Sequence, residues 1–174
     1  MGKFLPSFAL ALLASALSLP VDAAEFSIEN RLKAALIYKM GLYVTWNDSP
    51  SQVNYCFIGE QAEQISSILR RENEQGKLLK NVKIIQKPSI EEVALYECQV
   101  LFAPDIDSDD SELYQNISMS TLTITSKHRE LKNGIIASIE IKNRKPHLAV
   151  SKQNLKRSNI RIDTRLLASV TFKD

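Results

Sequence analysis

The sequence contains few of the residues that nucleotide-binding and metal-binding sites need. Its 174 residues include 5 glycines, 2 cysteines, 2 histidines and 1 tryptophan. Gly59 is followed by Glu-Gln-Ala, so the further glycines that let a backbone approach a pyrophosphate are missing, and there is no P-loop. Two scattered histidines and two cysteines do not supply the three or four converging ligands that zinc requires. We therefore expect no cofactor and no metal.

A marked excess of charge is also missing. The net charge of +2 argues against a nucleic-acid or polybasic membrane binder. His128, in a predicted polar loop, and His147, in a predicted strand, belong to no hydrolase motif, so the chain is not expected to be an enzyme. Residues 105–116 have the alternating carboxylates of a calcium loop, but Asp110 and Asn116 stand where that loop needs Gly and Glu. An exposed loop that caps the next helix is favoured over a calcium site.

The N-terminus has the features of a targeting segment. Lys3 precedes an apolar run over residues 8–17, and the small residues Ala23-Ala24 follow before the composition turns polar. This pattern predicts a cleaved signal peptide at residues 1–23, because a buried helix would show a polar face. The run is shorter than the ~20 residues that span a bilayer. We expect residues 24–174 to form one periplasmic domain.

In the remaining sequence, segments with the hydrophobic pattern of a helix alternate with segments that have the pattern of a strand. A helix is predicted over residues 28–44, where Leu32, Leu36, Met40 and Val44 repeat every four residues. After it come predicted strands at 53–59, 82–85, 98–103 and 121–125, and predicted helices at 61–74, 90–96 and 111–117. This alternation is typical of βαβ units around a parallel sheet. The predicted fold is therefore α/β, a three-layer α/β/α sandwich with a Rossmann-like, mostly parallel sheet.

The C-terminal part changes character. Residues 135–141 and 145–150 flank Lys-Asn-Arg, which predicts an antiparallel hairpin at the sheet edge. Two helices are predicted to follow, at 152–157 and 164–170, with Asp163 as the N-cap of the second.

The two cysteines fall in the first and third predicted strands. In a doubly wound sheet these strands are commonly neighbours, about 4.8 Å apart, which suits the geometry of a disulfide. Export makes the bond chemically permissible. We predict a disulfide between Cys56 and Cys98, and the alternative is two buried free thiols.

Four segments resemble, in the same order, those of the YfiR-like family of periplasmic proteins. They are residues 29–46, with a Lys-Ala-Ala-x-x-Tyr core and a terminal Trp, 55–59 (Tyr-Cys-Phe-Ile-Gly), 98–102 (Cys-Gln-Val-Leu-Phe) and 133–170. The chain departs from the family pattern mostly in the last segment, where Asn133 replaces the first Gly of a pair and Asp163-Thr164 replace Ser-Ser.

The resemblance implies a non-enzymatic repressor. Such a protein inhibits the periplasmic sensor part of an inner-membrane signalling enzyme, with a diguanylate cyclase as the best-known target, and thereby controls cyclic-di-GMP and biofilm formation. An outer-membrane lipoprotein can titrate it away. The alternative function is a periplasmic small-molecule-binding accessory protein of a histidine kinase.

Two further expectations concern surfaces. The family's tail motifs cluster near the predicted hairpin and the segment after it, so we expect a partner-binding surface there. Its predicted residues are Ile136, Leu148, Val150 and Ile160, and alternation along a strand leaves open that they are core residues. A homodimer is also expected, from the resemblance and from Tyr38 and Tyr43 beside the apolar stripe of the first helix. The alternative is that these rings complete the core.

Overall fold

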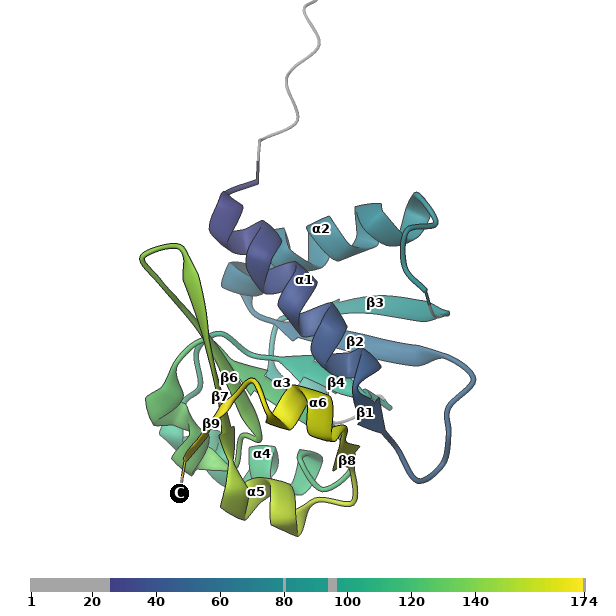
Figure 1. Cartoon of the computed structure of the whole chain (residues 1–174). Coiled ribbons are helices and arrows are strands. Elements are labelled where there is room, and N and C mark those ends of the chain that lie inside the picture. Colours follow the sequence, from purple (N-terminus) through teal and green to yellow (C-terminus); the bar gives the residue numbers. More distant parts are fainter. Residues whose placement is uncertain (1–25, 80, 94–96, 174) are drawn as a thin grey trace, which may run out of the picture.

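A computed structural model describes residues 26–79, 81–93 and 97–173 of the chain (Figure 1). The predicted signal peptide at 1–23 and the end of the predicted helix 90–96 lie outside the described residues. One seven-stranded sheet carries helices on both faces, and a separate two-stranded sheet lies beside it. The predicted fold class is confirmed.

The main sheet has the spatial order β3-β2-β4-β5-β6-β7-β9. Its strands are β2 (Val53–Ile58), β3 (Val82–Lys87), β4 (Val100–Phe102), β5 (Leu122–Thr125), β6 (Ala137–Lys142), β7 (Lys145–Ser151) and β9 (Thr171–Lys173). Neighbours from β3 through β6 run parallel, β6 and β7 run antiparallel, and β9 runs parallel to β7. The chain goes first to one side of β2 and then crosses to the other, as in flavodoxin-like sheets.

The C-terminal part differs from its prediction in two respects. The hairpin of β6 and β7 is present, but β9 pairs outside β7 and forms the edge of the sheet. The predicted last helix is shorter, because α6 spans only Thr164–Leu167 and the chain then extends into β9. Its N-cap is confirmed, since Asp163 Oδ1 accepts a hydrogen bond of 2.8 Å from the backbone N–H of Arg165.

Helices cover the sheet from two sides. One core cluster combines the sheet with α1 (Ile28–Leu42), α2 (Glu63–Glu74) and α6. The other combines it with α3 (Ile90–Val93), α4 (Ser111–Ile117) and the 3₁₀-helix η3 (His128–Asn133). Two further 3₁₀ turns, η1 (Glu60–Ala62) and η2 (Ser108–Asp110), precede α2 and α4, and α5 (Lys152–Arg157) follows β7. A sheet buried on both faces explains why its strands are apolar on both sides.

The first helix ends two residues earlier than predicted. β-branched Val44 and Thr45 form a short strand, β1 (Val44–Thr45), that pairs antiparallel with β8 (Arg161–Ile162). Such residues suit a strand better than a helix. This pair joins the end of α1 to the C-terminal segment.

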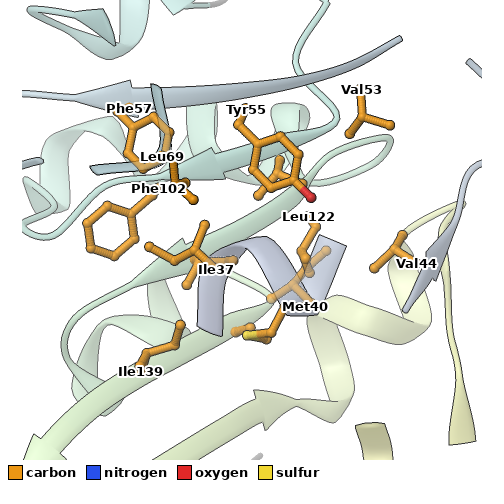
Figure 2. Packing of buried hydrophobic residues seen from close by; sticks show 14 of the residues in the cluster. Ile37, Met40, Val44, Val53, Tyr55, Phe57, Leu69, Phe102, Leu122 and Ile139 are labelled. Atoms are coloured by element: carbon orange, nitrogen blue, oxygen red, sulfur yellow. The ribbon is translucent and has the colours of Figure 1, made fainter. Parts of the chain in front are cut away.

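A close approach between α1 and β2 organises the larger core. Gly41 lacks a side chain where the ring of Tyr55 packs, and a Cβ there would overlap that ring and its hydroxyl. The hydroxyl of Tyr55 donates a 3.1 Å hydrogen bond to the carbonyl oxygen of Tyr38. Figure 2 shows Tyr55 beside Ile37 and Met40 of α1. Burial of the ring raises the pKa of Tyr55 far above its usual value.

Candidate functional site

The predicted disulfide is confirmed. Cys56 lies within β2 and Cys98 just before β4, with their Cα atoms 5.9 Å apart. The register places Leu101 opposite Cys56, so the bridge runs diagonally and fixes the segment that leads into β4. Both cysteines are buried in the smaller core cluster, which points to a structural role.

The predicted partner-binding residues are mostly core residues. Ile136, Val150 and Ile160 are buried in the larger cluster, and Leu148 packs half-buried against it. Ile136 also donates its backbone N–H to Thr123 Oγ1 at 2.9 Å, inside the sheet. The prediction is therefore wrong for the three buried side chains, since a partner cannot contact them without unfolding the core. Both faces of the sheet are covered, so apolar residues near its strands turn inward regardless of alternation.

The rings expected to support a dimer are also occupied within the chain. Tyr38 packs against the core, and its hydroxyl accepts a hydrogen bond of 2.6 Å from the backbone N–H of Leu79. The guanidinium of Arg165 lies 5.3 Å from the centre of the Tyr43 ring. Both rings therefore have partners within the chain while staying half-exposed, and the homodimer stays a prediction.

A groove that the sequence did not reveal lies between α1 and the β6–β7 hairpin, which projects beside the start of that helix (Figure 1). Its volume is about 330 Å³, and it is lined by Ile28, Glu29, Leu32, Ile141, Asn143 and Arg144. Ile28 is 70% exposed. We call these six residues the hairpin groove.

The hairpin turn shapes one wall of this groove. Lys142 pairs with Lys145, so Asn143 and Arg144 alone make the turn, and both have positive φ, 52° and 61°. This is the backbone of a type I′ turn, which fits the twist of a hairpin. A left-handed Arg costs ~1–2 kcal/mol, and such costs concentrate at functional sites.

A second concavity lies at the carboxyl ends of β2, β3 and β4. Its volume is about 480 Å³, and the residues that follow these three strands line it. Five of them carry carboxylates: Glu60, Glu91, Asp105, Asp107 and Asp110. Tyr114 of α4 also contributes to the wall. We call this concavity the acidic cleft.

The most reactive-looking arrangement is closed to substrates. His128 Nδ1 lies 2.7 Å from Ser138 Oγ, and His128 Nε2 lies 3.7 Å from Glu140 Oε2. Serine, histidine and a carboxylate form hydrolytic triads. Ser138, however, is fully buried in β6, so no substrate reaches its hydroxyl. Burial lowers the pKa of His128, although Glu140 opposes this effect.

Two further findings concern metal ions and membranes. Within the described ranges, no three His, Cys, Asp or Glu side chains come together in a way that could hold a metal ion. Among the same residues, none of the helices is long and apolar enough to cross a membrane.

Comparison with solved structures finds similar folds. A conserved domain protein from Vibrio cholerae O1 biovar El Tor is 13% identical with a TM-score of 0.51, over 84% of this chain and 60% of that one. The ABC domain in complex with L-Trp from Streptococcus pneumonia is 14% identical with a TM-score of 0.48, over 82% and 59%. The chain thus spans about three-fifths of the length of each protein.

The likeness to the Vibrio cholerae protein, at 13% identity, concerns the fold alone. No curated protein sequence matches the chain. The sequence profile of the YfiR/HmsC-like family (DUF4154) does match, over residues 30–169. That range includes the disulfide, both concavities apart from Ile28 and Glu29, and every strand of the main sheet except β9. The chain belongs to the YfiR/HmsC-like family.

Proposed function

We propose that this protein is a periplasmic regulator that binds the periplasmic sensor part of an inner-membrane signalling enzyme and lowers its activity. A diguanylate cyclase is the first candidate, so the protein would control cyclic-di-GMP levels and biofilm formation. The observation that carries this proposal is the family match over residues 30–169, which is consistent with a regulator in cyclic-di-GMP signalling.

The compartment is supported by the disulfide. Bonds of this kind form and persist where the surroundings are oxidising, as in the bacterial periplasm, and are rare in the cytosol. The bridge between Cys56 and Cys98 agrees with the export signal expected at residues 1–23. Both features support a protein that acts from outside the inner membrane.

The hairpin groove is the surface that best fits a protein partner. Ile28, Leu32 and Ile141 give it apolar lining, while Glu29 and Arg144 add charge of both signs. Apolar contact surrounded by polar groups is the usual anatomy of an interface. Glu29 is held by an ion pair of 2.8 Å with Lys33, which leaves Arg144 to contact an acidic group of the partner.

The same proposal includes two further interactions, with an outer-membrane lipoprotein and with a second copy of the chain. An outer-membrane lipoprotein would release the enzyme by competing for the regulator, and a homodimer would present two grooves at once. Both interactions can be sought by cross-linking in intact cells.

A deletion strain tests the proposed function. Loss of the protein is expected to raise cyclic-di-GMP and biofilm mass, and a copy of the gene supplied in trans is expected to restore both. The proposal is overturned if cyclic-di-GMP is the same with and without the protein under conditions in which the protein is abundant.

The acidic cleft favours a second candidate function. A concavity of about 480 Å³ at strand ends has the size and position of a small-molecule site, as a ligand-binding accessory protein of a histidine kinase requires. In that case deletion would change the output of a two-component system and leave cyclic-di-GMP unchanged. An adjacent gene for a histidine kinase, instead of a cyclase, would favour this candidate.

A further inference from the structure

The acidic cleft lies where open α/β sheets usually bind ligands. The connection from β2 leads to β3 on one side, and the chain then crosses to β4 on the other. Connections that diverge in this way leave a crevice outside the carboxyl ends of the strands. Ile58 at the end of β2, Ile90 after β3 and Pro104 after β4 line this crevice.

The lining carries negative charge without a matching positive charge. No Lys, Arg or His is among the described residues that line the cleft. One carboxylate is neutralised from outside, because Lys127 forms an ion pair with Asp105. Asp107 Oδ1 accepts a 3.1 Å hydrogen bond from the backbone N–H of Asp109 and caps η2.

Asp110 is one of the carboxylates without a compensating partner. Its carboxylate has no hydrogen-bond or ion-pair partner among the residues that the structure describes. Loss of hydration and the nearby charges of Glu91, Asp107 and Asp109 raise the pKa of Asp110. A cation bound in the cleft would relieve this repulsion.

The side chain of Tyr114 gives a second, independent indication of a ligand. The residue is only 2% exposed and lines the cleft, yet its hydroxyl makes no hydrogen bond within the described part of the chain. The hydroxyl oxygen of Tyr114 is not completely enclosed by protein atoms. It therefore reaches the accessible surface, at the cleft that the residue lines. Buried tyrosine hydroxyls usually have a partner, and here a ligand can supply it.

These features define the ligand by its chemistry. An anion would be repelled by the carboxylates. A single metal ion would need ligands that converge on one point, and no such group occurs among the described residues. The carboxylates instead follow three different strands, with Glu60 after β2, Glu91 after β3 and Asp110 after β4. Separated charges with the apolar side chains of Ile58, Ile90 and Pro104 among them suit several donors joined by a flexible apolar chain.

We propose that the acidic cleft binds a small linear polyamine, with one ammonium group at Asp110 and the Tyr114 hydroxyl and a second at Glu60 or Glu91. An ammonium group has three N–H donors and no acceptor, so it satisfies a carboxylate and a phenol oxygen together. This site is distinct from the hairpin groove, and it does not depend on which enzyme the protein regulates.

The test is calorimetric titration of the mature protein with spermidine and putrescine, with 1,4-butanediol and Mg²⁺ as controls. We expect saturable one-to-one binding of spermidine in the micromolar to ~1 mM range, weaker binding of putrescine and no binding of the diol. Asp110→Asn is expected to weaken spermidine binding by at least ~10-fold, since it removes a charge-assisted hydrogen bond.

Two further variants make the result specific. Asp109→Asn removes the same charge from the neighbouring residue, which does not line the cleft. It is expected to weaken binding by no more than ~3-fold, because its exposed charge acts on Asp110 only from a distance. Tyr114→Phe keeps the ring and removes only the hydroxyl, so it is also expected to weaken spermidine binding. It provides the test if Asp110→Asn does not fold.

Three results would overturn the proposal. They are no saturable heat with either amine, equal affinity in Asp109→Asn and Asp110→Asn, and full displacement of spermidine by an equal concentration of Mg²⁺. The second and third would mean that the amines only screen surface charge. A failure of this kind leaves the regulatory function untouched, because that function is measured by cyclic-di-GMP in cells.

Discussion

Cys56 and Cys98 are covalently joined although they are not partners in the sheet. Their Cα atoms lie 5.9 Å apart, while the residue opposite Cys56 is Leu101. The bridge therefore anchors the segment ahead of β4 to the middle of β2.

Loss of the disulfide is expected to destabilise the protein strongly. The bridge closes a loop with a sequence separation of 42 residues and so reduces the conformational entropy of the unfolded chain. In the chain-entropy description this contributes up to ~4 kcal/mol to the free energy of unfolding. We expect Cys56→Ala with Cys98→Ala to lower the free energy of unfolding by ~2–4 kcal/mol in urea titrations. Unchanged stability would mean that the bridge contributes nothing to the fold.

Asn154 connects α5 to the core through its side chain. Its Nδ2 group donates to the carbonyl oxygens of Leu131 and Ile135 at 2.7 and 2.8 Å, all within buried surroundings. Asn154→Ala removes both of these buried hydrogen bonds, so we expect a loss of ~1–3 kcal/mol in unfolding free energy. Gln153→Ala, on the exposed side of the same helix, is the control and should change it little. Equal effects in the two variants would contradict this assignment.

The environment of His128 predicts a loss of stability in mild acid. Burial lowers its pKa below the ordinary 6.5, with Lys142, Lys173 and His147 acting in the same direction and Glu140 opposing them. The unfolded chain therefore binds the proton first, so the stabilising contribution is complete above pH ~6.5 and is lost as pH falls through the folded-state pKa.

We expect His128→Gln to flatten the dependence of melting temperature on pH between ~7.5 and ~5.5. Lys156→Gln, at an exposed position of α5 that is not among the charges acting on His128, is expected to keep the wild-type slope. The lowered pKa of Glu140 acts in the same direction but only below its ordinary value of 4.5, outside this window. If both variants keep the wild-type slope, His128 is not the responsible group.

A substitution in the hairpin groove can test partner binding without affecting the stability of the fold. Ile28 is 70% exposed, so Ile28→Asp is expected to keep the wild-type melting temperature but weaken partner binding by ~10- to 100-fold, the equivalent of one buried apolar side chain. Leu79→Asp, at a residue 85% exposed outside the groove, is the matched control and should restore repression in a deletion strain. Repression by Ile28→Asp at wild-type strength would exclude the groove as the docking surface.

Much of the fold was predictable because it depends on local patterns. The alternation of strands and helices predicts the parallel sheet, and the placing of Cys56 in one strand and Cys98 at the start of its neighbour predicts the disulfide, although Cys98 lies just before β4. The edge strand β9 was missed because Thr171, Phe172 and Lys173 are three exposed residues without periodicity. The end of α1 was misplaced because the pairing of Val44 with Ile162 joins distant segments.

The sites were harder to predict for a physical reason. Ile136, Val150 and Ile160 are apolar in a sheet that helices cover on both faces, so their pattern is that of core residues and carries no information about partners. The hairpin groove and the acidic cleft are each assembled from several segments. Only the positive-φ turn at Asn143 and Arg144 had a local signal, the Lys-Asn-Arg interruption of the hairpin.

The most direct test of the central claim is an activity measurement on a membrane enzyme. A full-length diguanylate cyclase from the same organism, with a periplasmic segment, is reconstituted in lipid nanodiscs, where both faces are accessible. Cyclic-di-GMP formation from GTP is followed while the mature protein is added. We expect a saturable decrease in rate that Ile28→Asp produces only at higher concentration. An unchanged rate with every such cyclase of the organism would contradict the account.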